Sequence, residues 1–285
     1  MSNSRRSFLR NTALAGLAMS TPFSKELFAM AQKKNKFGIQ LWTVKQALAN
    51  DPVGVLKHLS NCGYKQIESF EGAKGMFWGM KNTEFKKLMD DLGMSMVASH
   101  CDISKDFERK AAEAGEIGMK YLICPHKGAQ KSIDNYKRFG DEFNKCGEIS
   151  VKNGIRFAYH NHDYSFKAMA GGMPQDVMMN GSDANLVDFE MDIYWVVAAG
   201  ADPIAYLKKY PNRFKLCHVK DLTKTATGVE SCVLGKGTID FKSILNVGAQ
   251  NGLKFHIIEQ EAYTGTNELD CARDNATAFT NLNWR

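Results

Sequence analysis

The sequence predicts one α/β domain, a (β/α)8 TIM barrel over residues 32–285. From residue 37 onward, eight short apolar runs alternate with amphipathic segments, which is typical of a parallel sheet covered by helices. This part of the chain has 254 residues (285 minus 31), close to the roughly 250 residues of such barrels. No Gly-x-Gly-x-x-Gly follows the first apolar run, so an open dinucleotide-binding sheet is not indicated.

The predicted strands are the eight apolar runs. They cover residues 37–42, 65–70, 94–99, 119–124, 155–160, 185–191, 214–219 and 253–259. Five glycines stand just before a strand, where a left-handed residue closes the preceding helix: Gly63, Gly93, Gly118, Gly154 and Gly252. These glycines support the predicted alternation of helix and strand.

The segments between the strands carry apolar residues three or four positions apart, as in Val53, Leu56 and Leu59. This spacing predicts amphipathic helices over 52–62, 83–92, 105–117 and 133–152. Two connections are longer, 161–184 after the fifth strand and 220–239 after the seventh. Because loops at the carboxyl ends of barrel strands build the active site, we expect the site there.

Residues 1–31 are predicted to be a twin-arginine signal peptide. Arg5 and Arg6 precede a short apolar stretch, and Ala29-Met30-Ala31 fits a small-x-small cleavage site. The stretch is too short for a good membrane-spanning helix, so we expect a periplasmic or otherwise exported protein without a membrane anchor after processing. The alternative is an N-terminal tail with no role in export.

Charge and cysteine content exclude several classes. The net charge is +6, and residues 1–31 contribute +3 of it, which leaves +3 for residues 32–285. This small, dispersed charge argues against nucleic acid as a partner. Seven cysteines without a Cys-x-x-Cys pair argue against structural zinc. Cys101, Cys124 and Cys217 lie in or beside apolar runs and are expected to be buried.

Strands five to eight each end in a side chain that binds metals, namely His160, Asp192, His218 and Glu259. Alternate residues of a barrel strand face the interior, so these four could converge on one divalent cation. Two imidazoles and two carboxylates suit Mn²⁺, Co²⁺, Fe²⁺, Zn²⁺ or Mg²⁺. Taken singly, each residue could instead be a core histidine or a helix cap, but their equivalent positions favour a shared metal.

Other side chains are expected to face the same cavity. Lys220 could place a cation beside a developing enolate oxygen, and His162 could transfer a proton. Glu190 lies one step deeper than Asp192 and could be an inward structural carboxylate. The candidates for substrate binding are Trp42, Glu68, His100, His126 and Glu261. The structural alternative for each is a rim or core residue.

On these residues the chain resembles the sugar phosphate isomerase/epimerase family of xylose-isomerase-like barrels. The resemblance extends to the runs 38–44, 159–163, 218–221 and 234–241, in the last of which Asp240 is a predicted helix N-cap. It implies one divalent metal, with Mn²⁺ as the expected ion, held by His160, Asp192, His218 and Glu259. The ketose 3-epimerases of the family have a glutamate where this chain has His160, and a histidine where it has Trp195.

The resemblance implies a metal-dependent isomerase or epimerase that removes a proton next to a carbonyl, with the metal stabilising the enolate. Glu259 or His162 would be the base and Lys220 the polarising cation. The alternative is a lyase or dehydratase acting on a 3-keto-glycoside or an inosose, because His218-Val219-Lys220-Asp221 also resembles that branch. A second alternative is a non-catalytic sugar-binding barrel. The expected partner is a small sugar or glycoside, and a homo-oligomer is left open.

Overall fold

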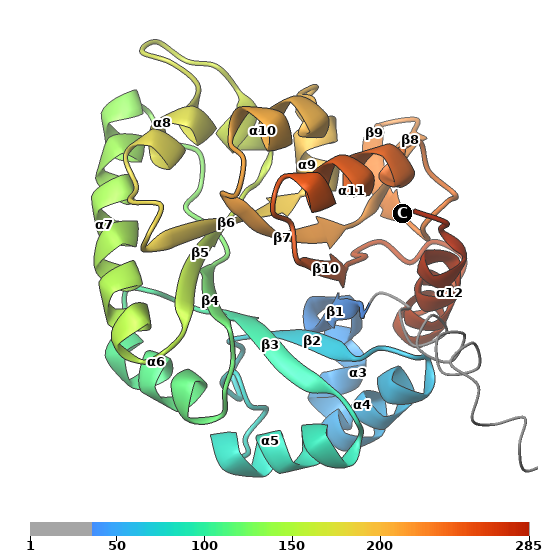
Figure 1. The fold of residues 1–285 in the computed structure, drawn as a ribbon. Coiled ribbons are helices and arrows are strands. Elements are labelled where there is room, and N and C mark those ends of the chain that lie inside the picture. Colours follow the sequence, from blue (N-terminus) through green and yellow to red (C-terminus); the bar gives the residue numbers. More distant parts are fainter. Residues whose placement is uncertain (1–35, 285) are drawn as a thin grey trace, which may run out of the picture. The chain divides into compact units, whose positions relative to one another are not determined.

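The computed structural model describes residues 36–284, so the predicted signal peptide lies outside the described residues. Eight parallel strands close into a barrel, in the order β1-β10-β7-β6-β5-β4-β3-β2 (Figure 1). Their bounds are β1 Gly38–Gln40, β2 Gln66–Phe70, β3 Ser95–His100, β4 Tyr121–Cys124, β5 Arg156–His160, β6 Val187–Asp192, β7 Phe214–Val219 and β10 Phe255–Ile258. All eight predicted strands and the TIM-barrel fold are therefore confirmed.

Helices surround the barrel (Figure 1). They are α3 Lys45–Asn50, α4 Pro52–Asn61, α5 Asn82–Asp91, α6 Phe107–Glu116, α7 Ile133–Lys152, α8 Pro174–Asn180, α9 Ile193–Ala198, α10 Pro203–Lys209, α11 Phe241–Gln250 and α12 Glu268–Asn281, with 3-10 turns η1 Leu41–Val44 and η2 Asp163–Phe166. The predicted cap Asp240 accepts a hydrogen bond from Ser243 N at the start of α11. The five predicted cap glycines all have positive φ. None of the helices described over residues 36–284 is long and apolar enough to cross a bilayer.

A small apolar cluster lies inside the barrel below the carboxyl ends of three strands. Ala158, Leu216 and Ile257 belong to a small buried cluster inside the ring of strands. Each is followed two positions later by a polar residue on the same face of its strand, namely His160, His218 and Glu259. The alternation of the strands therefore places a polar layer directly above an apolar one. Cys101, Cys124 and Cys217 are buried, as expected.

The two long connections contain secondary structure. The first holds η2 and α8. The second holds an antiparallel hairpin, β8 Asp221–Thr225 and β9 Gly228–Cys232, which the sequence did not predict. Its two strands are polar, and the turn between them lacks an Asn-Gly or Asp-Gly pair. The hairpin follows β7 directly, so it lies at the end of the barrel where the candidate site is.

Candidate metal centre

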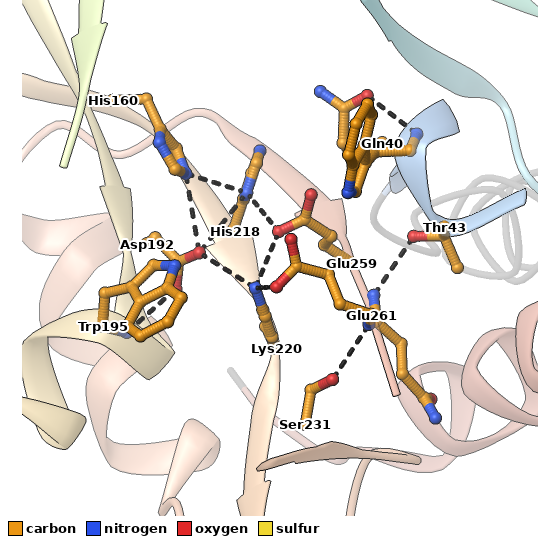
Figure 2. Close-up of polar contacts among 12 residues, drawn as sticks. Gln40, Thr43, His160, Asp192, Trp195, His218, Lys220, Ser231, Glu259 and Glu261 are labelled. Atoms are coloured by element: carbon orange, nitrogen blue, oxygen red, sulfur yellow. Dashed lines mark hydrogen bonds and ion pairs between the residues drawn. The ribbon is translucent and has the colours of Figure 1, made fainter. Parts of the chain in front are cut away.

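Four side chains from the ends of β5, β6, β7 and β10 meet at the carboxyl end of the barrel (Figure 2). They are His160, Asp192, His218 and Glu259, and one ligand atom from each lies within 4.8 Å of the other three. His218 Nδ1 is 3.1 Å from Glu259 Oε2 and 3.2 Å from His160 Nε2. Asp192 Oδ2 is 3.5 Å from His160 Nε2. The convergence expected from the sequence is therefore confirmed.

The donor set fits a divalent cation. An ion with bonds of about 2.1 Å holds its ligand atoms about 3 to 3.5 Å apart, which is close to the separations found here. Asp192 Oδ2 is buried and has no hydrogen-bond partner. Burying a carboxylate oxygen without a hydrogen bond costs free energy. All four side chains are buried, and His160 and Glu259 also line the cavity, so a bound ion would face the cavity. A divalent ion at this point would coordinate Asp192 Oδ2.

Local structure holds Asp192 in place. Its Oδ1 accepts a hydrogen bond from Trp195 N and so caps the first turn of α9, which leaves Oδ2 directed at the cluster. Its backbone forms two hydrogen bonds with the Asn161 side chain, at 3.1 and 3.2 Å. The ends of β5 and β6 are therefore fastened to each other next to the candidate ligands.

Lys220 is buried beside the cluster. Its Nζ lies 2.6 Å from Glu261 Oε2, 3.2 Å from Glu259 Oε2 and 3.7 Å from Asp192 Oδ2 (Figure 2). Burial alone would lower the pKa of Lys220, but the carboxylates of Glu259, Asp192 and Glu261 outweigh burial and raise it. The residue is therefore a permanent cation. It lies behind the cavity wall rather than in the cavity.

The candidate base Glu259 faces the cavity. Burial would raise its pKa, but Lys220 and His218 outweigh burial and hold the pKa of Glu259 well below its usual range. His162 also faces the cavity, and its ring centre is 5.0 Å from that of His126. Burial, together with the neighbouring His160, lowers the pKa of His162 to about 2. Both groups are therefore unprotonated at neutral pH, and it is their position that separates them: Glu259 belongs to the group of candidate metal ligands and His162 does not.

A second group of side chains lies deeper in the barrel and shares His218. It consists of Glu68 on β2, His100 on β3 and Glu190 on β6, and its ligand atoms also lie within 4.8 Å of one another. His100 Nε2 is 2.9 Å from Glu190 Oε2 and 3.1 Å from Glu68 Oε1. Burial would lower the pKa of His100, but these two carboxylates raise it to about 9. Glu190 is an inward, buried carboxylate, as expected.

A cavity of about 560 Å³ lies next to the candidate metal ligands, two of which, His160 and Glu259, line it. Four of the five predicted substrate residues line it, namely Trp42, His100, His126 and Glu261. The fifth, Glu68, is fully buried and is not part of the wall. The aromatic rings of Trp42, Phe70 and Trp195 add apolar surface to the same wall. This combination of apolar and polar surface suits a small polar molecule with a carbon ring.

Residues 56–279 match the sequence profile of the xylose isomerase-like TIM barrels. The chain belongs to this family. Two inosose dehydratases are among its curated relatives. The enzyme of Clostridium beijerinckii is 29% identical over 197 residues, which cover 57% of this chain and 61% of the relative. That of Clostridium tetani is 28% identical over 165 residues, which cover 51% of each. The chain thus matches between half and two thirds of the length of these relatives.

Solved members of the family have the same architecture. A sugar phosphate isomerase/epimerase from Parabacteroides distasonis superimposes with a TM-score of 0.75 at 28% identity. The match covers 85% of this chain and 96% of that structure. The similarity therefore extends over nearly the whole barrel described above.

Several residues of this xylose isomerase-like site were not singled out by the sequence. Glu71 and Asp102 line the cavity from positions just beyond the ends of β2 and β3. Polar residues at the carboxyl ends of barrel strands face the active site, so this position in the sequence could have indicated them. Ser231 could not have been predicted from a strand end, because it lies on strand β9, which the sequence did not predict. Its Oγ accepts hydrogen bonds from Glu261 N and Ala262 N, at 2.9 and 3.0 Å. The hairpin therefore fixes the segment that carries Glu261 (Figure 2).

Proposed function

We propose that this protein is a divalent-metal-dependent sugar lyase that removes a proton next to a carbonyl and expels a β-substituent. One observation carries the proposal. Glu259 is an ionised carboxylate between the cavity, the cation of Lys220 and the candidate metal ligands. The imidazole of His160 stands where epimerases of the resembled family have a second glutamate. One base suffices for elimination, whereas epimerisation needs proton donors or acceptors on both faces of the carbon.

In this mechanism the Glu259 carboxylate accepts the proton from the carbon next to the carbonyl. The electron pair of the broken C–H bond moves into an enolate. A bound divalent ion would supply a Lewis acid that stabilises the enolate oxygen. The ammonium of Lys220 adds a fixed positive charge close by, without needing to move during the reaction. When the electrons of the enolate re-form the carbonyl, the C–O bond at the β-carbon breaks. The proton held by Glu259 passes to the departing oxygen, so the products are an enone and a protonated leaving group, and Glu259 is ionised again.

The second candidate function is sugar isomerisation or epimerisation at the same site. The similarity to the isomerase/epimerase from Parabacteroides distasonis supports it. Both reactions begin with the same proton transfer to Glu259. They differ in the fate of the enolate, which is protonated again on carbon in isomerisation and loses a β-substituent in elimination.

We further propose that the substrate is not phosphorylated. Among the lining residues that the structure describes, Lys127 is the only lysine or arginine, and its Nζ is paired with Glu142 at 2.7 Å. The wall also carries four acidic residues, namely Glu71, Asp102, Glu259 and Glu261. A phosphate group would meet repulsion here instead of the Arg and Lys side chains that usually bind it. Neutral sugars and glycosides avoid this repulsion.

The reaction class is tested by incubating the Mn²⁺-loaded protein with inososes and 3-keto-glycosides in D₂O. We expect a new enone absorbance and a released leaving group, and we expect Glu259→Gln to be slower by about 10² to 10⁴-fold. Asp134→Asn, which changes an exposed carboxylate on α7, is the matched control and should keep full activity. Deuterium at the α-carbon without elimination would favour the isomerase. Tight sugar binding without turnover or bound metal would instead indicate a binding barrel.

Export remains a separate proposal that rests on residues 1–31. Their twin arginine and cleavage-site pattern support transport of the folded protein to the periplasm. A reporter fused to residues 1–31 should leave the cytoplasm, and Arg5→Lys with Arg6→Lys should retain it there. A reporter that stays in the cytoplasm with the native arginines would refute the proposal.

A further inference from the structure

The two ring nitrogens of His218 face two different groups of side chains. Nδ1 faces the candidate metal site, 3.1 Å from Glu259 Oε2 and 3.2 Å from His160 Nε2. Nε2 faces the deeper group, 2.7 Å from Glu68 Oε1. A neutral imidazole carries its proton on only one nitrogen. The nitrogen without the proton is the one that can bind a metal, so the position of the proton decides whether His218 is a ligand.

The surroundings of Glu68 decide where that proton lies. Glu68 Oε1 accepts a hydrogen bond from Gln40 Nε2 at 2.7 Å, and His100 Nε2 lies 3.1 Å away. Glu68 is completely buried, so its carboxylate is shielded from solvent. An ionised carboxylate has only acceptors. The short contact to His218 is therefore a hydrogen bond only if Nε2 is the donor.

We propose that Glu68 is a positioning residue that keeps the proton of His218 on Nε2, so that the Nδ1 lone pair faces the metal site. The proposal rests on the metal dependence in the proposed function. Ligand histidines commonly donate their second N–H to a carboxylate, and loss of such a partner typically lowers metal affinity about 10- to 100-fold. Gln40 supports the same arrangement because it holds Glu68 Oε1 against the ring.

A competing arrangement makes the opposite prediction. Glu68, His100, Glu190 and His218 could themselves surround a second metal ion, because their ligand atoms also lie within 4.8 Å of one another. That ion would need the lone pair of His218 Nε2, which the proposed arrangement protonates. For a neutral His218 the two arrangements exclude each other. The first predicts an ion bound through His218 Nδ1, and the second predicts an ion bound through Nε2.

The experiment compares Co²⁺ affinity, measured by competition with a chelator, in the wild type, Glu68→Gln and Asp188→Asn. Asp188 is the matched control, since it is another buried carboxylate inside the barrel. It accepts a hydrogen bond from Tyr121 at 2.9 Å and does not belong to either group of candidate ligands. We expect Glu68→Gln to bind Co²⁺ 10- to 100-fold more weakly and Asp188→Asn to bind it as the wild type does.

A second measurement does not depend on whether a variant folds. In the Zn²⁺-loaded wild type, ¹⁵N NMR should show His218 with a protonated Nε2 and a metal-bound Nδ1. A metal-bound Nε2, two ions per chain, or an unchanged affinity in Glu68→Gln would each overturn the role of Glu68. A wild type that binds no divalent ion at all would overturn the proposed function as well. The two failures are thus distinguished by the wild type alone.

Discussion

Replacing Lys220 with methionine should slow catalysis and yet strengthen metal binding. The ammonium lies 3.2 Å from Glu259 Oε2 and 3.7 Å from Asp192 Oδ2, and both carboxylates are candidate metal ligands. Lys220 and a divalent ion are therefore attracted to the same oxygens and repel each other. Without the ammonium, the ion alone neutralises these two carboxylates. We expect Lys220→Met to bind Co²⁺ at least about tenfold more tightly.

The distances also set the size of the effect on stability. Two unit charges 3.2 Å apart at an effective dielectric constant of about 20 interact by about 5 kcal/mol. Lys220 is only 1% exposed, so its removal leaves buried carboxylates without a cation, a change that typically costs about 3 to 5 kcal/mol. The metal-free variant should lose this much unfolding free energy. Added metal should restore most of it, because the ion replaces the missing positive charge.

Turnover should fall in the same variant. The loss of a fixed positive charge near a developing oxyanion typically lowers kcat by about 10² to 10³-fold. The assays are chelator competition, thermal unfolding with and without Co²⁺, and kcat on the best substrate. Lys110→Met is the matched control, because Lys110 is also buried and is paired with Glu71 at 2.6 Å, away from the metal ligands. If Lys220→Met binds Co²⁺ more weakly while Lys110→Met does not, the competition argument is wrong.

Three further outcomes follow from the same geometry. Asp192→Asn keeps the cap at Oδ1 but loses the ionised Oδ2, so elemental analysis should find less than about a tenth of the wild-type metal. Burial would lower the pKa of His218, but Glu190 and Glu259 outweigh burial and raise it. Because a metal ion must displace the proton on Nδ1, the Co²⁺ affinity should fall about tenfold for each pH unit below that pKa. Metal titrations at several pH values measure this slope. Asp188→Asn should lower the free energy of unfolding by about 2 kcal/mol in urea titrations, because Tyr121 and Arg156 lose a charged acceptor.

The fold and the four candidate ligands could be predicted from local patterns. A strand repeats every two residues, so the last inward residue of each strand can be read from the sequence once the strand is recognised. His160, Asp192, His218 and Glu259 obey this rule on four strands that are consecutive in the barrel. Closure of the barrel then brings them together, and no knowledge of individual contacts is needed.

Contacts across the barrel could not be predicted in this way. Glu68 and His218 lie 150 residues apart and on strands β2 and β7, which are not neighbours in the sheet. Their hydrogen bond depends on the tilt of the strands and on side-chain rotamers, neither of which leaves a pattern in the sequence. The position of Lys220 is similar. Its place beyond a strand end predicted a side chain that faces the cavity, but Asp192 at the end of β6 and the two glutamates after β10 surround its ammonium with carboxylates.

The arrangement of charges explains why the centre suits a divalent cation. Four buried carboxylates, those of Glu68, Glu190, Asp192 and Glu259, surround one buried lysine and the cationic His100. With His218 neutral and donating to Glu68, the carboxylates of Glu68, Asp192 and Glu259 carry three negative charges against two positive ones. Burial and the neighbouring Glu68 raise the pKa of Glu190 to about 7, and its ionised form adds a fourth negative charge. When Glu190 is ionised, an ion of charge +2 balances this group, and an uncompensated buried charge is costly in a low dielectric. Glu261 is 38% exposed at its side chain, so solvent screens its additional charge. The deeper network therefore contributes to the negative charge that favours a divalent ion, and in the proposed arrangement it also orients one ligand.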